Sequence, residues 1–554
     1  MTTRSHRILP VSRLTMLTAG LSVLLTFAPP GSAEDLPSQG SFAAPHLRNV
    51  ASATEQDNVH NPTRWKHPPR PQLPFSRMFP GLPAFAPATD DVRKRLAALG
   101  AKGGVIDAKD QLNDPILSIT TPGPDNPDNP NMTAGVTFLG QFLDHDITLD
   151  SRSPLLGTAS PQDTLNFRTA AFDLDSVYGG GPDGSPELYD RSSGYIKLRI
   201  DEIPGSAAVS RHRAVRFDVP RDANNAALLG DHRNDENIIL SQFHLAMLRF
   251  HNAVTDRVLA QYPGRSAGHI FGLAQRMVRW HYQWIILHEF LPLTIGQDRL
   301  DNLMRNGLKF YDPHSGAGGN PRIPVEFAVA AYRFGHSQVR PSYRVNFGPD
   351  GGPAVFRFVF DDMQDPSNPD PNDLRGGKRA PSRFVDWQTF FKFDEINFRP
   401  NKRIDGKLSS VLMNLPGSRA PAPGLPDDGV QSLPARNMLR HLTFGLPSGQ
   451  AVARKIGAPP LTPAQLYEYS QFGFADKTPL WLYVLKESEV VENGLRLGPV
   501  GSRIVGEVFI GLLKADKSSF LSAQPTWKPT LPSATPEDFR VTDLLNLAGV
   551  VLPL

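Results

Sequence analysis

Gly140-Gln141-Phe142-Leu143-Asp144-His145-Asp146-Ile147-Thr148 (residues 140–148) places a histidine between two aspartates, with a glutamine four positions earlier. On a helix, Gln141 and His145 share a face because positions i and i+4 lie one turn apart. The aspartates then point to either side, each at roughly 100° from the histidine. Burying this cluster is costly unless something charged lies nearby. The alternative is a solvated helix end, and the rest of the chain decides between the two.

The composition excludes several classes of protein. The chain has 554 residues, a hydrophobic share of 40%, a net charge of +3 and no Lys/Arg-rich block, so nothing indicates nucleic-acid binding. It contains no cysteine, which excludes disulfides, thiolate catalysis, iron–sulfur clusters and cysteine-ligated haem. Stability must then come from the size of the core, or from a bound metal or cofactor.

The N-terminus predicts export. Residues 1–33 read as a signal peptide, with a basic start that includes Arg4 and Arg13, an apolar run over 14–28, and Gly31-Ser32-Ala33 as a cleavage site. The run is too short for a comfortable membrane span, and no later segment has the length of one. We expect a secreted or periplasmic protein with no stable membrane span in the mature chain. An uncleaved anchor is the alternative.

Helical periodicity dominates the rest of the chain. Residues 34–129 are rich in Pro, Asn and Asp and predict an irregular N-terminal extension with one short helix over 90–99. Residues 130–515 predict a single large helical domain, and 516–554 a C-terminal tail packed on it. The fold class is therefore mainly α with little β structure. Beyond the opening stretch, the expected helices are 238–261, 271–291 (ended by Pro292), 325–339 (stopped by Pro341), 435–441, 464–469 and 501–513, and the one expected strand is 354–360.

Two histidines, His244 and His251, lie on or beside the apolar stripe of the 238–261 helix. A histidine in that setting is more often a hydrogen-bonded core residue than a metal ligand. We therefore expect both to be core residues.

Three further segments carry candidate chemistry. Thr169-Ala170-Ala171-Phe172-Asp173-Leu174-Asp175 alternates oxygen donors in the manner of a calcium-binding loop but lacks EF-hand spacing, so an aspartate-rich turn is the alternative. Gly230-Asp231-His232-Arg233-Asn234-Asp235-Glu236 puts an arginine and a glutamate three apart, able to face one cavity, unless it is an ordinary capped helix start. Arg333-Phe334-Gly335-His336 sets a histidine after a glycine that would let a flat cofactor approach the backbone. Alone, that histidine would more often be a core residue.

Together, the four segments resemble the animal-type haem peroxidases of the peroxidase–cyclooxygenase superfamily in order and approximate spacing. Ala435-Arg436-Asn437-Met438 and Gly445-Leu446-Pro447 add a fifth match, and the region 481–511 is similar to the family's C-terminal helices. The resemblance covers roughly residues 130–515. It implies that this span is a haem peroxidase domain.

The resemblance implies roles on both sides of a haem. His145 would be the distal base that takes a proton from hydrogen peroxide, Arg233 would support the leaving oxygen, and Gln141 would help hold the distal water and any halide. His336 would be the proximal iron ligand. Two further residues would assist on the proximal side: Asn437 would accept the other N–H of that imidazole, and Arg333 would pair with a haem propionate.

The resemblance also implies the cofactors, haem b and calcium. Asp144 and Glu236 match the carboxylates that form ester bonds to haem in the family, and the sequence leaves open whether either bond forms. The calcium ligands would be Asp146, Thr169, Ala171 (through its carbonyl), Asp173 and Asp175.

This sequence departs from the family pattern at three places. Asn237 follows Glu236 where some members have a methionine bonded to a haem vinyl, so that link is excluded. Asp175 replaces a usual hydroxyl residue and adds a negative charge to the calcium site. Residues 439–444 differ from the pattern that usually follows the asparagine.

The implied function is a haem-dependent peroxidase that reduces hydrogen peroxide and oxidises a halide, thiocyanate or small aromatic donor. A fatty-acid dioxygenase of the same superfamily is an alternative. It would need a tyrosine three positions before the proximal histidine, where this chain has Arg333, while Tyr332 lies about 100° further round a helix. A non-catalytic extracellular haem-binding or adhesion protein is the other alternative. The donor, the biological role and the oligomeric state stay open.

Overall fold

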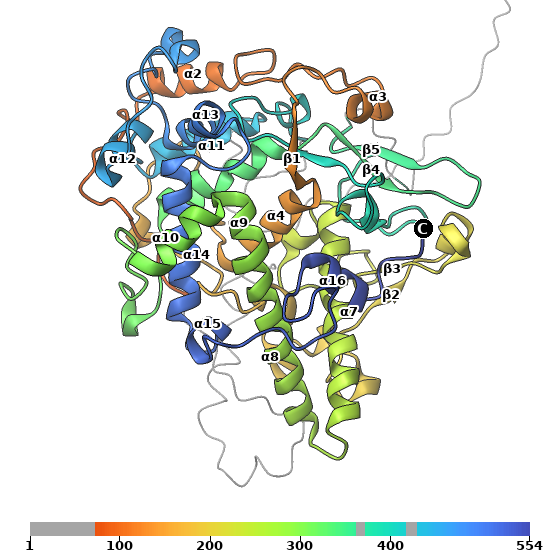
Figure 1. Cartoon of the computed structure of the whole chain (residues 1–554). Helices are drawn as coiled ribbons and strands as arrows, with labels where there is room; N and C mark the ends of the chain where they lie inside the picture. The colour runs from red at the N-terminus through yellow and green to blue at the C-terminus, as the bar shows by residue number, and fades with distance from the viewer. Residues whose placement is uncertain (1–71, 362–369, 371, 417–428) are drawn as a thin grey trace, which may run out of the picture. The chain divides into compact units, whose positions relative to one another are not determined.

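Helices are the predominant regular elements of the structure, a computed structural model that describes residues 72–361, 370, 372–416 and 429–554. The predicted signal peptide lies outside the described residues. The fold is mainly α, as predicted, and the described strands form three two-stranded antiparallel sheets, β1–β6, β2–β3 and β4–β5 (Figure 1). The α-helices are α2 Asp90–Leu99, α3 Pro115–Thr120, α4 Gly135–Ile147, α5 Asp175–Tyr178, α6 Gly181–Gly184, α7 Ile238–Gln261, α8 Ala267–Ile285, α9 Leu291–Ile295, α10 Gln297–Asn306, α11 Leu433–Thr443, α12 Gly449–Ile456, α13 Leu480–Glu492, α14 Pro499–Ala515, α15 Phe520–Ala523 and α16 Val541–Leu547. The strands are β1 Asp128–Thr133, β2 Asp201–Glu202, β3 Phe217–Asp218, β4 Ser342–Asn346, β5 Val355–Phe358 and β6 Pro400–Lys402.

Polar caps explain where several helices begin. The side chain of Asn237 accepts the N–H of Leu240 at the start of α7, and Ser266 does the same for His269 in α8. Each cap satisfies a backbone donor that has no partner within the helix. The bounds of α7 are those predicted from its apolar periodicity.

Short strands join distant parts of the chain. β1 pairs with β6, which ties the residues just before α4 to residues 400–402. β4 pairs with β5 and confirms the strand predicted within 354–360. The helix α3 was missed, although Asp114 caps it and Pro115 occupies its first position, a recognisable start signal.

The prediction that Pro292 ends a helix is wrong. After α8, the π-helical turn η10 (Ile286–Phe290) leads directly into α9, in which Pro292 is the second residue. A proline inside a continuous helical path removes one backbone hydrogen bond, and the carbonyl of His288, four residues earlier, accepts a hydrogen bond from the side chain of Arg540 instead. The helical path therefore continues to Ile295.

The segment 325–339 is also not a regular α-helix. It consists of a π-helical turn, η12 (Glu326–Ala330), followed by a 3₁₀-helix, η13 (Ala331–Gln338). The side chain of Arg333 donates from Nε to the carbonyl of Ala328 across the junction, at 3.0 Å, and so gives that carbonyl a polar partner. The predicted helix over 464–469 is likewise a 3₁₀-helix, η16, shifted to Tyr467–Phe472.

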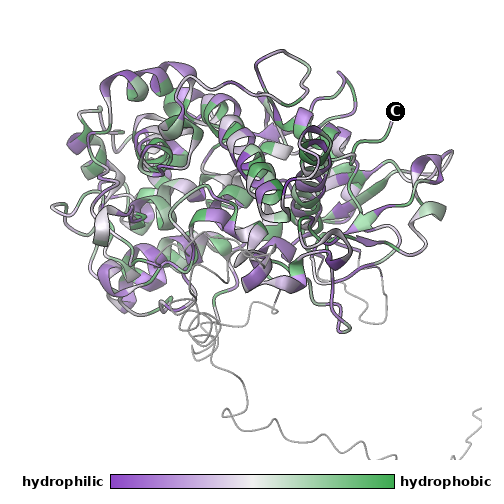
Figure 2. Cartoon of the chain, turned by 90° about the horizontal axis from the view of Figure 1, so that it is seen from below, coloured by the Kyte–Doolittle hydropathy of each residue, from purple (hydrophilic) through white to green (hydrophobic). Residues whose placement is uncertain are grey.

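The helix α4 lies in the interior, where Phe142 and Leu143 are fully buried. It packs against α7, against the 3₁₀-turn η9 (His232–Asp235) and against η13. Apolar residues face inward and polar residues cover the outside of most helices (Figure 2). In the described part of the chain, no helix is long and apolar enough to cross a membrane. The motif 140–148 on α4 therefore lies where α7, η9 and η13 meet.

Candidate functional site

The side chain of His145 is buried at the C-terminal end of α4 and hydrogen-bonded to η9. Its Nδ1 lies 2.9 Å from Oδ1 of Asn234, and Nδ2 of Asn234 lies 3.0 Å from Nδ1 of His244 on α7. Burial, reinforced by the charge of Arg233, lowers the pKa of His145 from its ordinary value of 6.5. The imidazole is therefore neutral near pH 7 and able to accept a proton.

Arg233 is fixed beside His145. Its Nη2 donates to the carbonyls of His145 and Thr148, at 3.1 and 2.7 Å, and to the carboxylate of Asp231, at 2.7 Å. Burial alone would raise the pKa of Asp231, but the charge and hydrogen bonds of Arg233 outweigh burial and hold that pKa below its usual range. Among the hydrogen bonds of the described residues, none involves Nη1 of Arg233, which leaves that nitrogen available to a ligand.

The other predicted residues of α4 face η9 or the helix end. Gln141 donates from Nε2 to Glu236, at 3.2 Å, and its Oε1 accepts from Asn237, at 3.3 Å. Asp144 accepts a hydrogen bond from the hydroxyl of Thr148, at 2.9 Å. Gln141 and Asp144 are half-buried, and Glu236 is exposed. These side chains can therefore contact a bound group.

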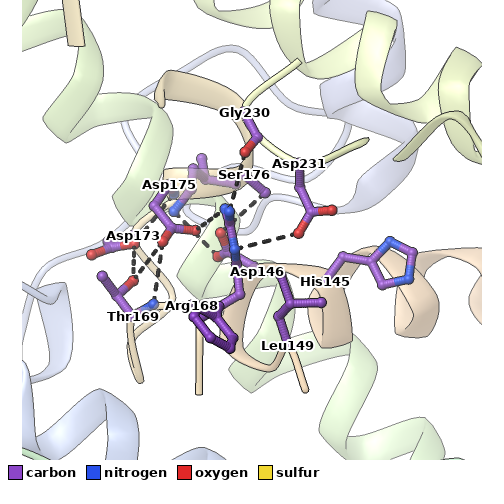
Figure 3. Close-up of polar contacts among 12 residues, drawn as sticks. His145, Asp146, Leu149, Arg168, Thr169, Asp173, Asp175, Ser176, Gly230 and Asp231 are labelled. Carbon is purple, nitrogen blue, oxygen red and sulfur yellow. Dashed lines mark hydrogen bonds and ion pairs between the residues drawn. The ribbon is translucent and has the colours of Figure 1, made fainter. Parts of the chain in front are cut away.

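Asp146 points to the opposite side of α4 from His145, into a cluster of carboxylates (Figure 3). Carboxylate oxygens of Asp146, Asp173 and Asp175 lie within 4.8 Å of one another. Burial and the charges of the other two raise the pKa of Asp146 well above its ordinary value, and burial raises the pKa of Asp175 to about 6. Thr169 donates from its hydroxyl to Asp173, at 2.9 Å, and Ala171 is fully buried in the same loop. The arrangement suits a divalent cation with oxygen ligands.

Arg168 links this cluster to Arg233. It donates to Asp175 at 3.1 Å and to the carbonyl of Gly230 at 3.2 Å, and it forms an ion pair with Asp231 at 3.4 Å (Figure 3). Since Asp231 also binds Arg233, a row of alternating charges runs from the cluster to Arg233. Arg168 also offsets the negative charge that Asp175 adds relative to a hydroxyl residue.

The predicted proximal residues meet between η13 and α11. Nδ2 of Asn437 lies 2.8 Å from Nδ1 of His336, and Nη1 of Arg333 donates to Oδ1 of Asn437 at 3.0 Å. The amide nitrogen therefore faces His336, whereas the sequence predicts the oxygen there. The reason is that Arg333 can only donate and takes the oxygen. His441 on α11 accepts the N–H of Trp481, at 2.9 Å, and so ties α11 to α13.

Two features of the proximal segment fit a flat, anionic group. A Cβ built on Gly335 would have no heavy atom within 4 Å, so open space adjoins the backbone next to His336. Burial, together with the charge of Arg440, lowers the pKa of Arg333 to about 10. Among the described residues, no carboxylate lies within ion-pair distance of Arg333. A porphyrin with carboxylate side groups suits both features.

Both histidines of α7 that we expect to be core residues are buried and hydrogen-bonded, which confirms that prediction. His244 is next to Asn234, and Nδ1 of His251 lies 3.0 Å from the hydroxyl of Tyr178. The sequence reasoning assigned no role to Asn234 or Arg168. Asn234 lies inside one of the quoted motifs and Arg168 directly precedes another. This proximity to the motifs was the only feature of the sequence that could have indicated a role for them.

Comparison with known proteins gives consistent matches. Residues 151–355 match the family model described as animal haem peroxidase. The chain is 28% identical to the human peroxidasin homolog over 251 residues, which is 42% of this chain and 17% of that protein. The chain spans only 12–17% of the length of the first curated relatives that it matches.

Two solved structures share the fold. Peroxidase A from Dictyostelium discoideum superposes with a TM-score of 0.54 at 18% identity and covers 81% of this chain and 88% of its own. The fatty acid alpha-dioxygenase of Oryza sativa has a TM-score of 0.50 at 15% identity and covers 85% of this chain and 90% of its own. Both likenesses concern the fold alone.

Proposed function

We propose that the chain is a haem-dependent peroxidase, because residues 151–355 match the animal haem peroxidase family model and the chain is similar to the human peroxidasin homolog. It would reduce hydrogen peroxide and oxidise a halide, thiocyanate or small aromatic donor. The observation that carries the proposal is the meeting of His145 and Arg233 at one end of α4, a neutral base beside a fixed cation. This pair supplies what cleavage of a peroxide bond requires of a protein.

Each side chain has a defined task in this proposal. Nε2 of His145 accepts the proton of the peroxide oxygen that will bind the metal, and returns it to the departing oxygen, which leaves as water. The charge of Arg233 stabilises the departing oxygen, and its position is fixed by Asp231 and two backbone carbonyls. Gln141, held by Glu236 and Asn237, orients the water or halide next to the base.

Haem b fits the proximal residues. His336 would ligate the iron, Arg333 would pair with a propionate, and Asn437 would hold His336. When bound there, haem would supply the redox chemistry that couples reduction of the peroxide to oxidation of the donor. Asp144 and Glu236 are the carboxylates that would form ester bonds to it.

Calcium is proposed at the carboxylate cluster on the other side of α4. Asp146, Thr169, Ala171, Asp173 and Asp175 would bind the ion, with Ala171 contributing only its carbonyl. Burial, together with the repulsion among three close carboxylates, raises the pKa values of Asp146 and Asp175. A divalent cation together with Arg168 would balance their charge. Because Asp146 adjoins His145, the ion would also hold the distal base in place.

We also propose that residues 130–515 form the peroxidase domain, that 516–554 complete it, and that residues 1–33 direct export to a secreted or periplasmic location. Export would be tested by expressing the full chain and determining the N-terminal residue of the protein recovered outside the cytoplasm.

The test of the function uses the full chain produced with ample haem. We expect a Soret band and peroxide-dependent oxidation of iodide or guaiacol. His145→Ala should keep the Soret band and slow peroxide cleavage by about 10²–10⁴-fold, the usual contribution of a general base. His314→Ala, at an exposed histidine, is the matched control. Colourless wild-type protein, or peroxide cleavage unchanged in His145→Ala, would contradict the proposal.

The dioxygenase alternative would require a tyrosyl radical near the haem. In η13, a 3₁₀-helix with three residues per turn, the residue on the face of His336 one turn earlier is Arg333. The hydroxyl of Tyr332 instead donates to the carbonyl of Gly140, at 3.0 Å. Measuring oxygen uptake with a polyunsaturated fatty acid distinguishes the two activities. We expect this protein to show no such uptake.

A further inference from the structure

Asn234 lies between two imidazoles in the interior of the protein. Its Oδ1 is 2.9 Å from Nδ1 of His145, and its Nδ2 is 3.0 Å from Nδ1 of His244. The side chains belong to η9, α4 and α7, and all three residues are at most 5% exposed. One short row of hydrogen bonds therefore connects three separate elements behind the candidate base.

The chemistry of the amide fixes the direction of each bond. An amide oxygen only accepts and an amide nitrogen only donates. The proton of His145 therefore sits on Nδ1, and Nδ1 of His244 carries a lone pair. Burial lowers the pKa of His244 to about 3, so this imidazole stays neutral and one of its ring nitrogens carries a lone pair. The amide N–H of Asn234 that faces Nδ1 requires that nitrogen to be the acceptor. With its proton on Nδ1, His145 has a free lone pair on Nε2.

We propose that Asn234, supported by His244, is the positioning residue that holds His145 in the tautomer able to accept a proton at Nε2. This inference rests on the proposed peroxidase function. The reverse orientation of the amide would place the proton of His145 on Nε2, and that tautomer could not act as the base. The amide direction shown here is the one in which His244 acts as the acceptor.

The surroundings leave His145 few other ways to be held. The backbone carbonyl of His145 is already bound by Arg233, so the main chain at this position is fixed independently of the imidazole. The ring of Phe142 meets His244 edge-on, with centroids 6.2 Å apart, and fills the space beside the row. Replacing Asn234 would leave a buried N–H on His145 without an acceptor, and moving the proton to Nε2 would relieve that cost.

The experiment compares four variants of the haem-loaded full chain: Asn234→Leu, Asn234→Asp, His244→Phe and His251→Phe. Leucine has a similar size but no acceptor, whereas aspartate keeps an oxygen for His145. His251 is the matched control because it lies on the same helix, equally buried, and bonds to Tyr178 rather than to the distal residues. Two quantities are measured near pH 7: the rate of peroxide cleavage, and the C–O stretching frequency of the ferrous carbon monoxide complex.

We expect Asn234→Leu to keep the Soret band, to slow peroxide cleavage by at least about tenfold because the base is lost from part of the population, and to lower the C–O stretching frequency, since an N–H at Nε2 would now donate to the bound ligand. Asn234→Asp should restore most of the rate and the wild-type frequency. His244→Phe should fall between the two, and His251→Phe should not shift the frequency.

Three outcomes would overturn the proposal. An unchanged rate and frequency in Asn234→Leu would show that the tautomer does not depend on Asn234. Equal loss of rate in the Leu and Asp variants, with no shift in frequency, would assign Asn234 a merely structural role. Wild-type protein that binds haem but does not cleave peroxide would overturn the proposed function, and this inference with it.

Discussion

The two candidate haem-facing imidazoles are each paired with an asparagine, but the two amides are turned in opposite directions. On the distal side the amide oxygen of Asn234 faces His145, and on the proximal side the amide nitrogen of Asn437 faces His336. The difference lies in the third partner. His244 offers a lone pair to the first amide, whereas Arg333 can only donate and takes the oxygen of the second.

The comparison indicates that the third partner of each asparagine decides which atom of the amide faces the histidine. A neutral imidazole that binds a metal through Nε2 carries its proton on Nδ1 and needs an acceptor there. Asn437 can serve as that acceptor once Arg333 has another anion to bind, and a porphyrin carboxylate is such an anion. The amide of Asn234 already presents its oxygen to His145 and needs no change of partner. We therefore expect the distal pair to govern peroxide cleavage and the proximal pair to govern haem retention.

The largest effect should come from removing the proximal imidazole. His336→Gly should abolish most of the Soret absorbance, because the iron would lose its only protein ligand. Added imidazole should restore the band by entering the space left by the side chain. The measurement is an absorption spectrum of purified protein with and without imidazole. A full Soret band in the unsupplemented variant would show that the ligand is another residue.

A smaller effect is expected at Asn437. Asn437→Leu should weaken haem retention by about 10–100-fold, the usual range for a group that holds a metal ligand. Asn437→Asp keeps an oxygen for His336 and for Arg333, so it should retain haem as well as the wild type. Transfer of haem to apomyoglobin measures both, in protein whose haem is not ester-bonded to the chain. Equally fast release of haem from Asn234→Leu and Asn437→Leu would contradict the assignment of haem retention to the proximal pair.

The carboxylate cluster offers a further test of the difference between the two histidine–asparagine pairs. It includes Asp146, which is next to His145 in the sequence, so loss of the ion should affect the His145 pair first. Chelation should lower the free energy of unfolding by about 2.7 kcal/mol for an ion present at 100 times its dissociation constant. It should slow peroxide cleavage while the folded protein keeps its haem. Thermal unfolding in EDTA and in added calcium measures the change in the free energy of unfolding. The unfolding curve of Asp173→Asn should be the same in EDTA and in calcium. Identical unfolding curves for the wild type under both conditions would count against the calcium site.

Local sequence patterns predicted the helices better than the side-chain partners. The apolar repeat and the capping residue of α7 define its bounds, because both act within a few residues. The segment 325–339 was misjudged, since its π- and 3₁₀-turns depend on long-range contacts. One example is the buried Glu326, whose carboxylate accepts the N–H of Met78 at 2.9 Å. Turns of this kind leave no periodic signal.

The same distinction applies to the site. Residues such as His145 and Arg233 could be chosen because their motifs occur together in one family. The role of Asn234 depends on a contact with a residue 89 positions away in the sequence, and a single asparagine carries no motif. Its proposed role rests on its burial and on its hydrogen bonds to two imidazoles.

The smallest expected effect concerns pH, and it tests whether the distal base is as buried as the structure has it. His145 must be neutral to accept a proton, so peroxide cleavage is lost as pH falls through its pKa. Burial and the charge of Arg233 lower that pKa below 6.5. The midpoint of the decline in the rate constant should therefore lie below pH 6.5. Arg233→Gln removes a positive charge, so its decline should begin at higher pH than in the wild type, whatever its absolute rate. A midpoint of the wild-type pH–rate profile at or above pH 6.5 would mean that water reaches His145. The imidazole would then be less buried than the structure has it.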